Sequence, residues 1–417
     1  MREMKDSGFG YLGAIPADWK TERIKNHLRF SPDKNPGEAT VLSLYREHGI
    51  VPKDSRDDNH NVTSEDTSNY RYVQIGDFVV NKMKAWQGSM AVSNHEGIVS
   101  PAYYVYRFIS DSFEKKYLHY LLRSKCYADE FRRLSAGIRI GQWDLPKSGF
   151  ETTYVAIPSK GEQQRITNAI DIQLKKVDAL ISNVAAQIEK LKAYKQSLIS
   201  EVITKGLDAT IPLKDSGLGW ATKIPSSWLV LPVGKIMYEK KERTKTGTET
   251  PLSVTQAQGI VLAENANASN PTSSYIDWRC VEVDDIVFNK YKAHSGVFFV
   301  SPLSGIVTFN YSVYKCYDGY NPKYFEYQFK TAGCISEFRM SMRGVGDSIS
   351  PLYTRELFRI FVLCPPKDEQ DEIVKYIDKK FEQIGQLIAV KQAKIEKLEQ
   401  YKKSLIYEYV TGKKEVS

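Results

Sequence analysis

One unit of sequence occurs twice in this chain, and this duplication constrains the fold more than any other feature. Three stretches recur at a nearly constant offset: KDSGFGYLGAIPADW at 5–19 and KDSGLGWATKIPSSW at 214–228, GDFVVNKMKA at 76–85 and DDIVFNKYKA at 284–293, and segments that begin with Glu-Gln at 162–181 and 369–388. The duplicated unit is therefore about 200 residues long. It predicts two equivalent modules related by an approximate dyad, which suits a target with two halves.

The composition indicates a globular protein with a mild preference for polyanions. The chain has 417 residues, of which 42% are hydrophobic and 26% charged, and its net charge is +8. No apolar run approaches the roughly 18–20 residues of a membrane span, and the first ten residues lack the apolar core of a signal peptide. The five cysteines form no CxxC pair. We therefore expect no membrane association, no disulfide framework, no zinc site and a cytoplasmic location.

Each unit divides into a globular domain and a long helical segment. Short β-type runs (77–82, 102–108, 285–290 and 311–316) precede helical patterns near 113–131 and 321–340. This order of elements predicts an α+β domain with a twisted, mixed sheet.

The helical segment of each unit has the pattern of a coiled coil. One runs from Glu162 to about Lys205 and the other from about Glu369 to Thr411, and apolar residues recur in both at steps of three and four. A helix of this length must bury its apolar seam. Pairing with its dyad-related copy gives an antiparallel coiled coil, whereas packing of each helix on its own domain is the alternative.

The expected fold class is thus α+β, with two pseudo-repeated mixed α/β domains separated by two long helices that form an antiparallel coiled coil. The boundaries that we predict are 1–157 for the first domain, 158–208 for the central helix, 209–365 for the second domain and 366–417 for the C-terminal helix.

The order of these motifs resembles the specificity (S) subunits of type I restriction–modification systems. The resemblance is carried by an N-terminal G.IP..W, a strand followed by NK.KA..G, and IP or PP followed by EQ at the start of a long helix, all present twice. It implies target-recognition domains that bind double-stranded DNA, and helices that act as spacers and docking sites. It also implies two DNA-methyltransferase (M) subunits and restriction/translocase (R) subunits as partners. S-adenosylmethionine, ATP and Mg would then belong to those partners, and this chain would need no cofactor.

The motifs that could indicate an enzyme are weak. Gly8, Gly10 and Gly13 spell GxGxxG, but no strand pattern precedes them, and they more plausibly shape a turn before the first strand. Asn321 and Pro322 resemble part of a methyltransferase motif, yet they suit the N-cap and first residue of a helix. The sequence has no P-loop, no carboxylate–lysine nuclease pattern and no histidines at metal-ligand spacing. We therefore expect a non-catalytic subunit with no catalytic residue and no metal site.

Residues suited to DNA contact follow the repeated NK.KA..G strand. We predict that Lys82, Lys84, Lys290 and Lys292 contact phosphates, with alternation placing the lysines of each pair on one strand face. A merely solvated face is the alternative. The residues that follow differ between the units, so Trp86 and Gln87 in one and His294 in the other are candidate base readers. Glycine-rich loops add Arg139, Gln142 and Arg343.

Two stretches, about 30–70 and 238–275, diverge most between the units and carry further candidates: Arg46, Lys53, Arg56, His60, Lys240, Lys241, Arg243, Lys245, Gln256 and Gln258. Common frames with different loops predict a bipartite target whose half-sites differ in sequence. The competing interpretation is a non-catalytic scaffold whose two modules bind protein or carbohydrate ligands.

Overall fold

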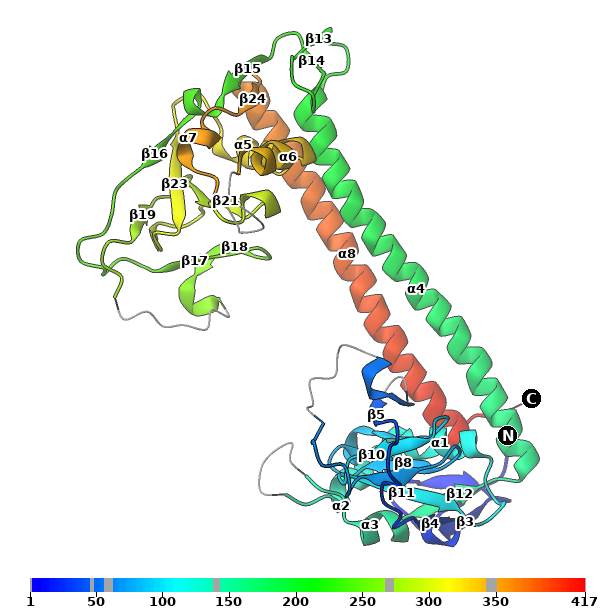
Figure 1. The fold of residues 1–417 in the computed structure, drawn as a ribbon. Coiled ribbons are helices and arrows are strands. Elements are labelled where there is room, and N and C mark those ends of the chain that lie inside the picture. The colour runs from blue at the N-terminus through cyan, green and yellow to red at the C-terminus, as the bar shows by residue number, and fades with distance from the viewer. Residues whose placement is uncertain are drawn as a thin grey trace. The chain divides into compact units, whose positions relative to one another are not determined.

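The computed structural model describes residues 2–45, 49–55, 63–137, 143–266, 274–342 and 351–416. The chain forms two compact units, one made of Met1–Ala185 with Gln392–Ser417 and the other of Ala186–Lys391. Each unit contains one globular domain and a part of each long helix (Figure 1). Within the described residues, no helix is both long enough and apolar enough to cross a membrane. The four domain boundaries drawn from the sequence stay a prediction.

The globular domain of the first unit is built mainly from short strands. These are β1 (Met4–Asp6), β2 (Ala14–Pro16), β3 (Lys20–Arg23), β4 (Leu28–Phe30), β5 (Leu42–Tyr45), β6 (Gly49–Pro52), β7 (Arg71–Val73), β8 (Phe78–Asn81), β9 (Met90–Val92), β10 (Gly97–Val99), β11 (Tyr103–Phe108) and β12 (Tyr154–Ile157). Its helices are α1 (Lys115–Arg123), α2 (Lys125–Leu134) and α3 (Lys147–Thr152), with 3-10 turns η1 (Ile24–Asn26), η2 (Lys53–Ser55) and η3 (Ala85–Gln87).

The domain of the second unit repeats this order of elements. Its strands are β13 (Leu213–Asp215), β14 (Lys223–Pro225), β15 (Leu229–Pro232), β16 (Met237–Lys240), β17 (Leu252–Thr255), β18 (Gly259–Leu262), β19 (Arg279–Val281), β20 (Ile286–Asn289), β21 (Phe298–Val300), β22 (Gly305–Val307), β23 (Tyr311–Cys316) and β24 (Phe361–Cys364). Its helices are α5 (Pro322–Phe329), α6 (Ala332–Ser341) and α7 (Thr354–Leu357), with η4 (Val233–Lys235), η5 (Ala263–Asn265) and η6 (Ala293–Ser295).

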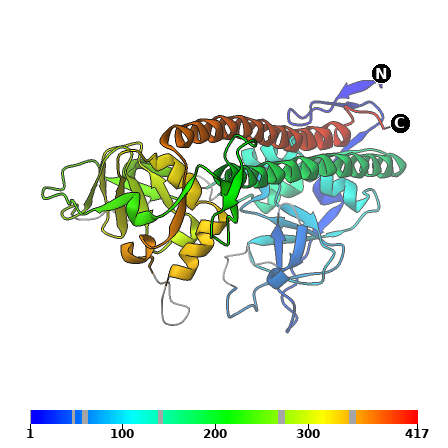
Figure 2. The ribbon, with the colours of Figure 1, turned by 90° about the horizontal axis from the view of Figure 1, so that it is seen from above.

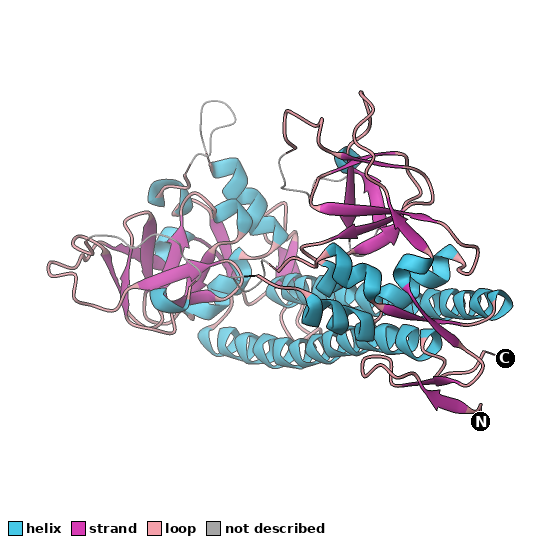
Figure 3. Cartoon of the chain, turned by 90° about the horizontal axis from the view of Figure 1, so that it is seen from below, coloured by secondary structure: helices cyan, strands magenta, loops and turns pink. Residues whose placement is uncertain are grey.

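A four-stranded antiparallel sheet lies at the centre of each domain. Its order is β4-β11-β8-β9 in the first unit and β16-β23-β20-β21 in the second. Successive side chains of a strand point to opposite faces, so Phe78 and Val80 enter the core beneath the helices, while Val79 enters a smaller core with β5 and β10. In the first unit the helices lie on one side of this central sheet (Figure 3). The central strand is buried on both faces, which explains its continuous apolar sequence.

The helical patterns near 113–131 and 321–340 are each divided into two helices. Ser124 separates α1 from α2, and Thr331 caps α6 by accepting the backbone N–H of Cys334. Hydroxyl residues favour the N-cap position, where the side chain satisfies a free backbone donor. Asn321 is the N-cap of α5 and Pro322 its first residue, as expected. The GxGxxG stretch forms the turn between β1 and β2, so it follows the first strand instead of preceding it.

The two long helices are α4 (Lys160–Lys205) and α8 (Lys367–Val410), of 46 and 44 residues. In the first unit the start of α4 lies against the end of α8, because Ile166 and Ile170 share one core with Leu405 and Val410.

In the second unit the end of α4 lies against the start of α8. Here Val202 and Ile203 share a core with Ile373 and Ile377. The start of one helix meets the end of the other in both units, which confirms the antiparallel pairing predicted from the heptad pattern. Each globular core is thereby completed by the last turns of the helix that follows the other domain in sequence.

A buried tryptophan anchors the start of each long helix. The indole N–H of Trp19 donates to the Glu162 carboxylate at 3.1 Å, and that of Trp228 donates to Glu369 at 2.9 Å. Both rings are completely buried. The repeated Trp and Glu, some 140 residues apart in each unit, therefore meet in one structural bond.

The glutamine of the repeated Glu-Gln pair ties the helix to the globular domain. The Gln163 side chain accepts the backbone N–H of Glu114 at 2.7 Å and donates to the carbonyl of Pro158 at 2.9 Å. Gln370 makes the equivalent two bonds at 2.8 and 2.9 Å. Since both side chains are at most 1% exposed, water cannot replace these partners.

A glycine closes the end of each long helix against the tryptophan at the start of the other. Gly206 and Gly412 have φ of 70° and 69°, in the left-handed region that glycine adopts without strain. A Cβ at Gly412 would lie 2.3 Å from Pro16 and 3.1 Å from the Trp19 ring. Both chain termini lie on the same side of the first unit (Figure 2).

Replacing the junction glutamine by leucine should destabilise the fold. Gln163→Leu or Gln370→Leu leaves a buried N–H and a buried carbonyl without partners, at a cost of about 1–3 kcal/mol for each group. We expect a lower unfolding temperature by calorimetry for either variant. Gln164→Leu, at the exposed neighbouring position, is the control and should change little. An unfolding temperature equal to wild type in the two junction variants would contradict this account.

Candidate nucleic-acid interface

The repeated NK.KA..G motif forms a rigid turn at the end of the central strand. In the first unit the Asn81 side chain accepts the backbone N–H of Met83 at 3.1 Å. Ala85 is completely buried and begins η3, and Gly88 ends this turn with φ of 75°. The second copy builds the same turn with Asn289, Ala293 and Gly296. The Asn, Ala and Gly of the motif are thus structural, and the lysines between them are not required for the turn.

The motif lysines lie within this turn and not on the strand. β8 ends at Asn81 and β20 at Asn289, so the expectation that alternation places Lys82 and Lys84 on one strand face is wrong. The physical reason is the asparagine side chain, which bonds to the following backbone and ends the strand. Lys84 and Lys292 are exposed, whereas Lys82 and Lys290 are half-buried.

The two half-buried lysines have different electrostatic surroundings. The Lys82 ammonium pairs with the Asp144 carboxylate at 3.0 Å. Lys290 has no carboxylate within ion-pair distance among the described residues, and burial together with the nearby Arg279 guanidinium lowers its pKa. The charge of the turn lysine is therefore partly neutralised in the first unit, whereas in the second unit no described carboxylate pairs with it.

Two arginines that sequence reasoning missed occupy equivalent positions in the two units, and the second, Arg279, lies near Lys290. Arg71 on β7 and Arg279 on β19 each have an Nε that is buried and without a hydrogen-bond partner among the described residues. The Arg71 guanidinium lies 4.9 Å from the centre of the Phe30 ring, while Arg279 pairs with Glu239 at 3.2 Å. The spacing from Arg71 to Lys82 equals the spacing from Arg279 to Lys290. This shared spacing is the sequence signal from which the two arginines could have been identified.

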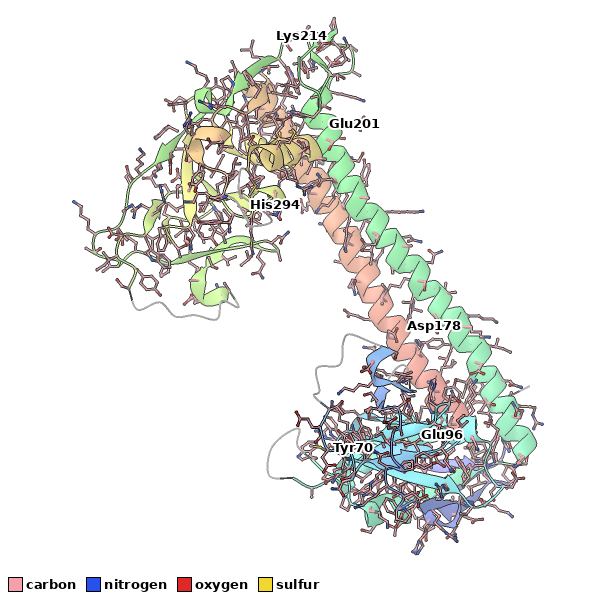
Figure 4. All side chains as sticks on the ribbon, in the orientation of Figure 1. Tyr70, Glu96, Asp178, Glu201, Lys214 and His294 are labelled. Atoms are coloured by element: carbon pink, nitrogen blue, oxygen red, sulfur yellow. The ribbon has the colours of Figure 1, made fainter. Side chains whose placement is uncertain are left out.

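The residues that follow the lysines present different chemistry in the two units. Trp86 donates its indole N–H to the Met83 carbonyl at 3.1 Å, and its ring meets Trp143 edge-on at 5.3 Å. Gln87 lies beside it in η3 and is partly buried. In the second unit the equivalent of Trp86 is His294, which lies in η6 where the domain meets the helix pair (Figure 4).

Several predicted contact residues lie outside the described parts of the chain, among them the candidate base readers Arg139, Gln142 and Arg343. The divergent-stretch residues Arg46, Arg56 and His60 lie outside as well.

Within the described residues one candidate is excluded as a DNA contact. The Lys240 side chain is 5% exposed and pairs with Asp285 at 2.8 Å and Glu282 at 3.1 Å. This lysine therefore stabilises the fold and is not available to a phosphate.

Burial shifts the pKa values of several cysteines and of one histidine so that their neutral forms are favoured. Burial raises the pKa of the Cys316, Cys334 and Cys364 thiols to about 12, and burial with nearby Arg123 lowers the pKa of His119 to about 3. Among the residues that the structure describes, no group of three or more His, Cys, Asp or Glu side chains could hold a metal ion. The described site offers cations, amides and aromatic rings, which suit binding of an anion.

Comparison with known proteins gives a consistent set of relatives, although no protein-family model matches the chain. A Methanocaldococcus jannaschii protein named "Putative type I restriction enzyme MjaX specificity subunit" is 22% identical over 96% of this chain and 95% of its own length. The type I restriction enzyme MjaVIII specificity subunit of the same organism is 24% identical over 54% of this chain and half of its own length.

Two solved structures share the fold over nearly the whole chain. One chain comes from a study of complex assembly and conformational transition of the type I R-M system, with a TM-score of 0.64 and 14% identity over 95% of this chain and 99% of that one. The other is the HsdS subunit from Thermoanaerobacter tengcongensis, with a TM-score of 0.51 and 15% identity over 95% and 98%. The resemblance to type I specificity subunits that the motifs indicated is thus confirmed, and the expected fold class with it.

Proposed function

We propose that this chain is the DNA-specificity subunit of a type I restriction–modification complex and works in the cytoplasm on a bipartite duplex target. The observation that carries the proposal is the NK.KA..G turn, which occurs once in each unit. Both copies have the same rigid backbone and two lysines, but the side chains that follow the lysines differ. Phosphate contacts position a protein on DNA, whereas contacts to base edges specify sequence. A common frame with different neighbours therefore suits two half-sites of different sequence.

In this proposal the chain binds the DNA target, and the partner subunits carry out the chemical reactions. Methyl transfer from S-adenosylmethionine and ATP-dependent cleavage with Mg would belong to the M and R subunits. This chain would supply Lys82, Lys84, Lys290 and Lys292 as phosphate contacts, with Arg71 and Arg279 as further basic side chains of the two domains. His294, Trp86 and Gln87, together with Arg139, Gln142 and Arg343, remain our candidates for reading bases.

The helix pair carries matching apolar residues that suit two copies of one partner. In the first unit Leu180 and Tyr401 are 51% and 47% exposed, and their equivalents in the second unit, Leu387 and Tyr194, are 51% and 50% exposed. Large apolar side chains left in water at equivalent positions mark candidate protein contacts. We assign one M subunit to each of these two patches.

The function is tested by expressing the chain together with its methyltransferase subunit. We expect the complex to bind duplex DNA with strong salt dependence and to methylate one asymmetric, two-part sequence that genome-wide methylation mapping identifies. Without this chain, the methyltransferase should no longer methylate that sequence, and the chain alone should transfer no methyl group. Methylation of the same site without this chain would refute the proposal. Selective binding of a glycan or peptide instead of DNA would favour the scaffold interpretation.

The unequal charge of the two turns predicts unequal salt effects. If Lys290 contacts a phosphate, Lys290→Ala should lower the slope of log affinity against log salt by about one, with the preferred sequence unchanged. Lys82→Ala should lower it by less, because Asp144 already pairs with this lysine. Filter binding of the assembled complex at several salt concentrations measures both slopes. Lys223→Ala, at an exposed lysine outside the turns, is the control. Equal slopes for wild type and Lys290→Ala would favour a merely solvated lysine.

The two apolar patches predict a change in stoichiometry. Tyr194→Ala and Tyr401→Ala should each weaken one M-subunit contact by about 2 kcal/mol, the scale of an aromatic hot spot. Native mass spectrometry at limiting concentration should then show complexes with one M subunit for either variant, and mostly free chain for the double variant. Tyr238→Ala is the control, because Tyr238 is 39% exposed and lies on the globular domain. This variant should still bind two M subunits. Two M subunits on the double variant would place the docking surface elsewhere.

A further inference from the structure

A cavity of about 520 Å³ lies within the second unit, where the globular domain meets the helix pair. Lys195 and Gln196 of α4 and Phe381 of α8 line one side, and His294, Phe299 and Lys330 of the domain line the other. His294 stands at this junction in Figure 4. The volume is in the range of small-molecule sites, roughly 300–1,000 Å³.

The ammonium group of Lys195 carries a charge that no neighbouring acid offsets. It lies 4.3 Å from the centre of the Phe381 ring, and no carboxylate of the described chain is within ion-pair distance. A ring face attracts a cation but leaves its full charge available to an anion.

The equivalent lysine of the first unit, Lys402, is paired with two acidic residues that the second unit lacks. Lys402 pairs with Asp178 at 2.7 Å and with Glu399 at 3.6 Å. The second unit has Gly385 and Lys192 at the positions of those two acids. The helix pair therefore neutralises this lysine in one unit only, and the free charge in the other is not a requirement of the coiled coil.

A second lysine adds to the positive charge of the cavity. Lys330 is bonded to Glu326 at 2.6 Å, but Glu326 also pairs with Lys323 at 2.9 Å, so one carboxylate serves two ammonium groups. The Lys330 ammonium also lies 4.1 Å from the centre of the Phe299 ring, and burial lowers its pKa. Its carbonyl accepts the side-chain N–H of Gln196 at 2.8 Å, which fixes this wall of the cavity to α4.

Both aromatic rings of the cavity belong to the second unit alone. Phe299 and Phe381 correspond to Ala91 and Leu174 in the first unit, so the shared fold needs only an apolar residue at these positions. His294 likewise replaces Trp86. Gln256 adds a side-chain amide from the loop after β17. Cations, flat apolar walls and groups that donate and accept hydrogen bonds are thus gathered in one place.

We propose that this cavity binds a nucleoside phosphate, with Lys195 paired to the phosphate and the base held among Phe299, Gln256 and His294. Charge-assisted bonds favour the phosphate, and aromatic side chains provide surfaces for a base. The ligand is either a free nucleotide or a nucleotide unstacked from bound DNA, and the second source rests on the proposed function.

The first test measures free nucleotide on the full chain. Equilibrium dialysis with labelled deoxyadenosine monophosphate should show one saturable site, and Lys195→Gln should weaken it at least about tenfold, the scale of one charged hydrogen bond. The matched variant Lys402→Gln, at the equivalent helix position, should bind as wild type does. Deoxyadenosine should compete more weakly than the monophosphate.

The second test measures a nucleotide within DNA. The complete complex is bound to target duplexes that carry 2-aminopurine at single positions, and a rise in fluorescence at one position that Lys195→Gln abolishes would identify DNA as the source. A positive result in either test supports the cavity as a nucleotide site. Negative results in both overturn it, and if the complex still binds duplex DNA, the proposed function survives. Failure of wild type to bind duplex counts against that function, while dialysis still decides the cavity.

Discussion

Burial of the apolar seam of the two long helices is the constraint on which the rest of this structure depends. Neither α4 nor α8 can leave such a stripe in water, and each covers it with the other helix and with one globular core. Leu405 and Val410 complete the first core, and Val202 and Ile203 complete the second. The hydrogen-bonded junctions at Trp19 and Trp228 then hold the helix starts in place. The motifs shared by the two units consist largely of the residues at these junctions. They therefore indicate how the chain folds more than what it binds.

The same frame carries different charges in its two copies. Asp144 pairs with Lys82 in the first unit, whereas Lys290 has Arg279 for a neighbour in the second. On the helices, Lys402 is held by two acids while Lys195 lies free over a ring. Because these substitutions touch neither the buried seam nor the junctions, the same fold accommodates both sets of charges. Duplication followed by such surface changes is a physical route to a protein that treats two halves of one ligand differently.

A hydrogen bond, burial and a left-handed glycine hold each turn in one conformation. The asparagine, alanine and glycine of each turn are fixed by the backbone bond, burial and left-handed φ. A lysine that projects from a fixed turn loses less conformational entropy on binding than one on a mobile loop. The groups that differ between units, such as Trp86 and His294, are therefore presented from the same rigid support.

The sequence by itself determined the duplication, the α+β class, the two long helices and their antiparallel pairing. These follow from periodicity and from the need to bury a seam, which are properties of residue order. It also indicated the turn lysines, but assigned them to a strand, because alternation alone cannot show that the Asn81 side chain ends the strand. Only the tertiary structure decided which charges remain free. Lys240 and Lys195 look alike in sequence, yet one is enclosed by Asp285 and Glu282 and the other lies over Phe381. Pairing of charges depends on distances between residues remote in the chain, and those distances exist only after folding.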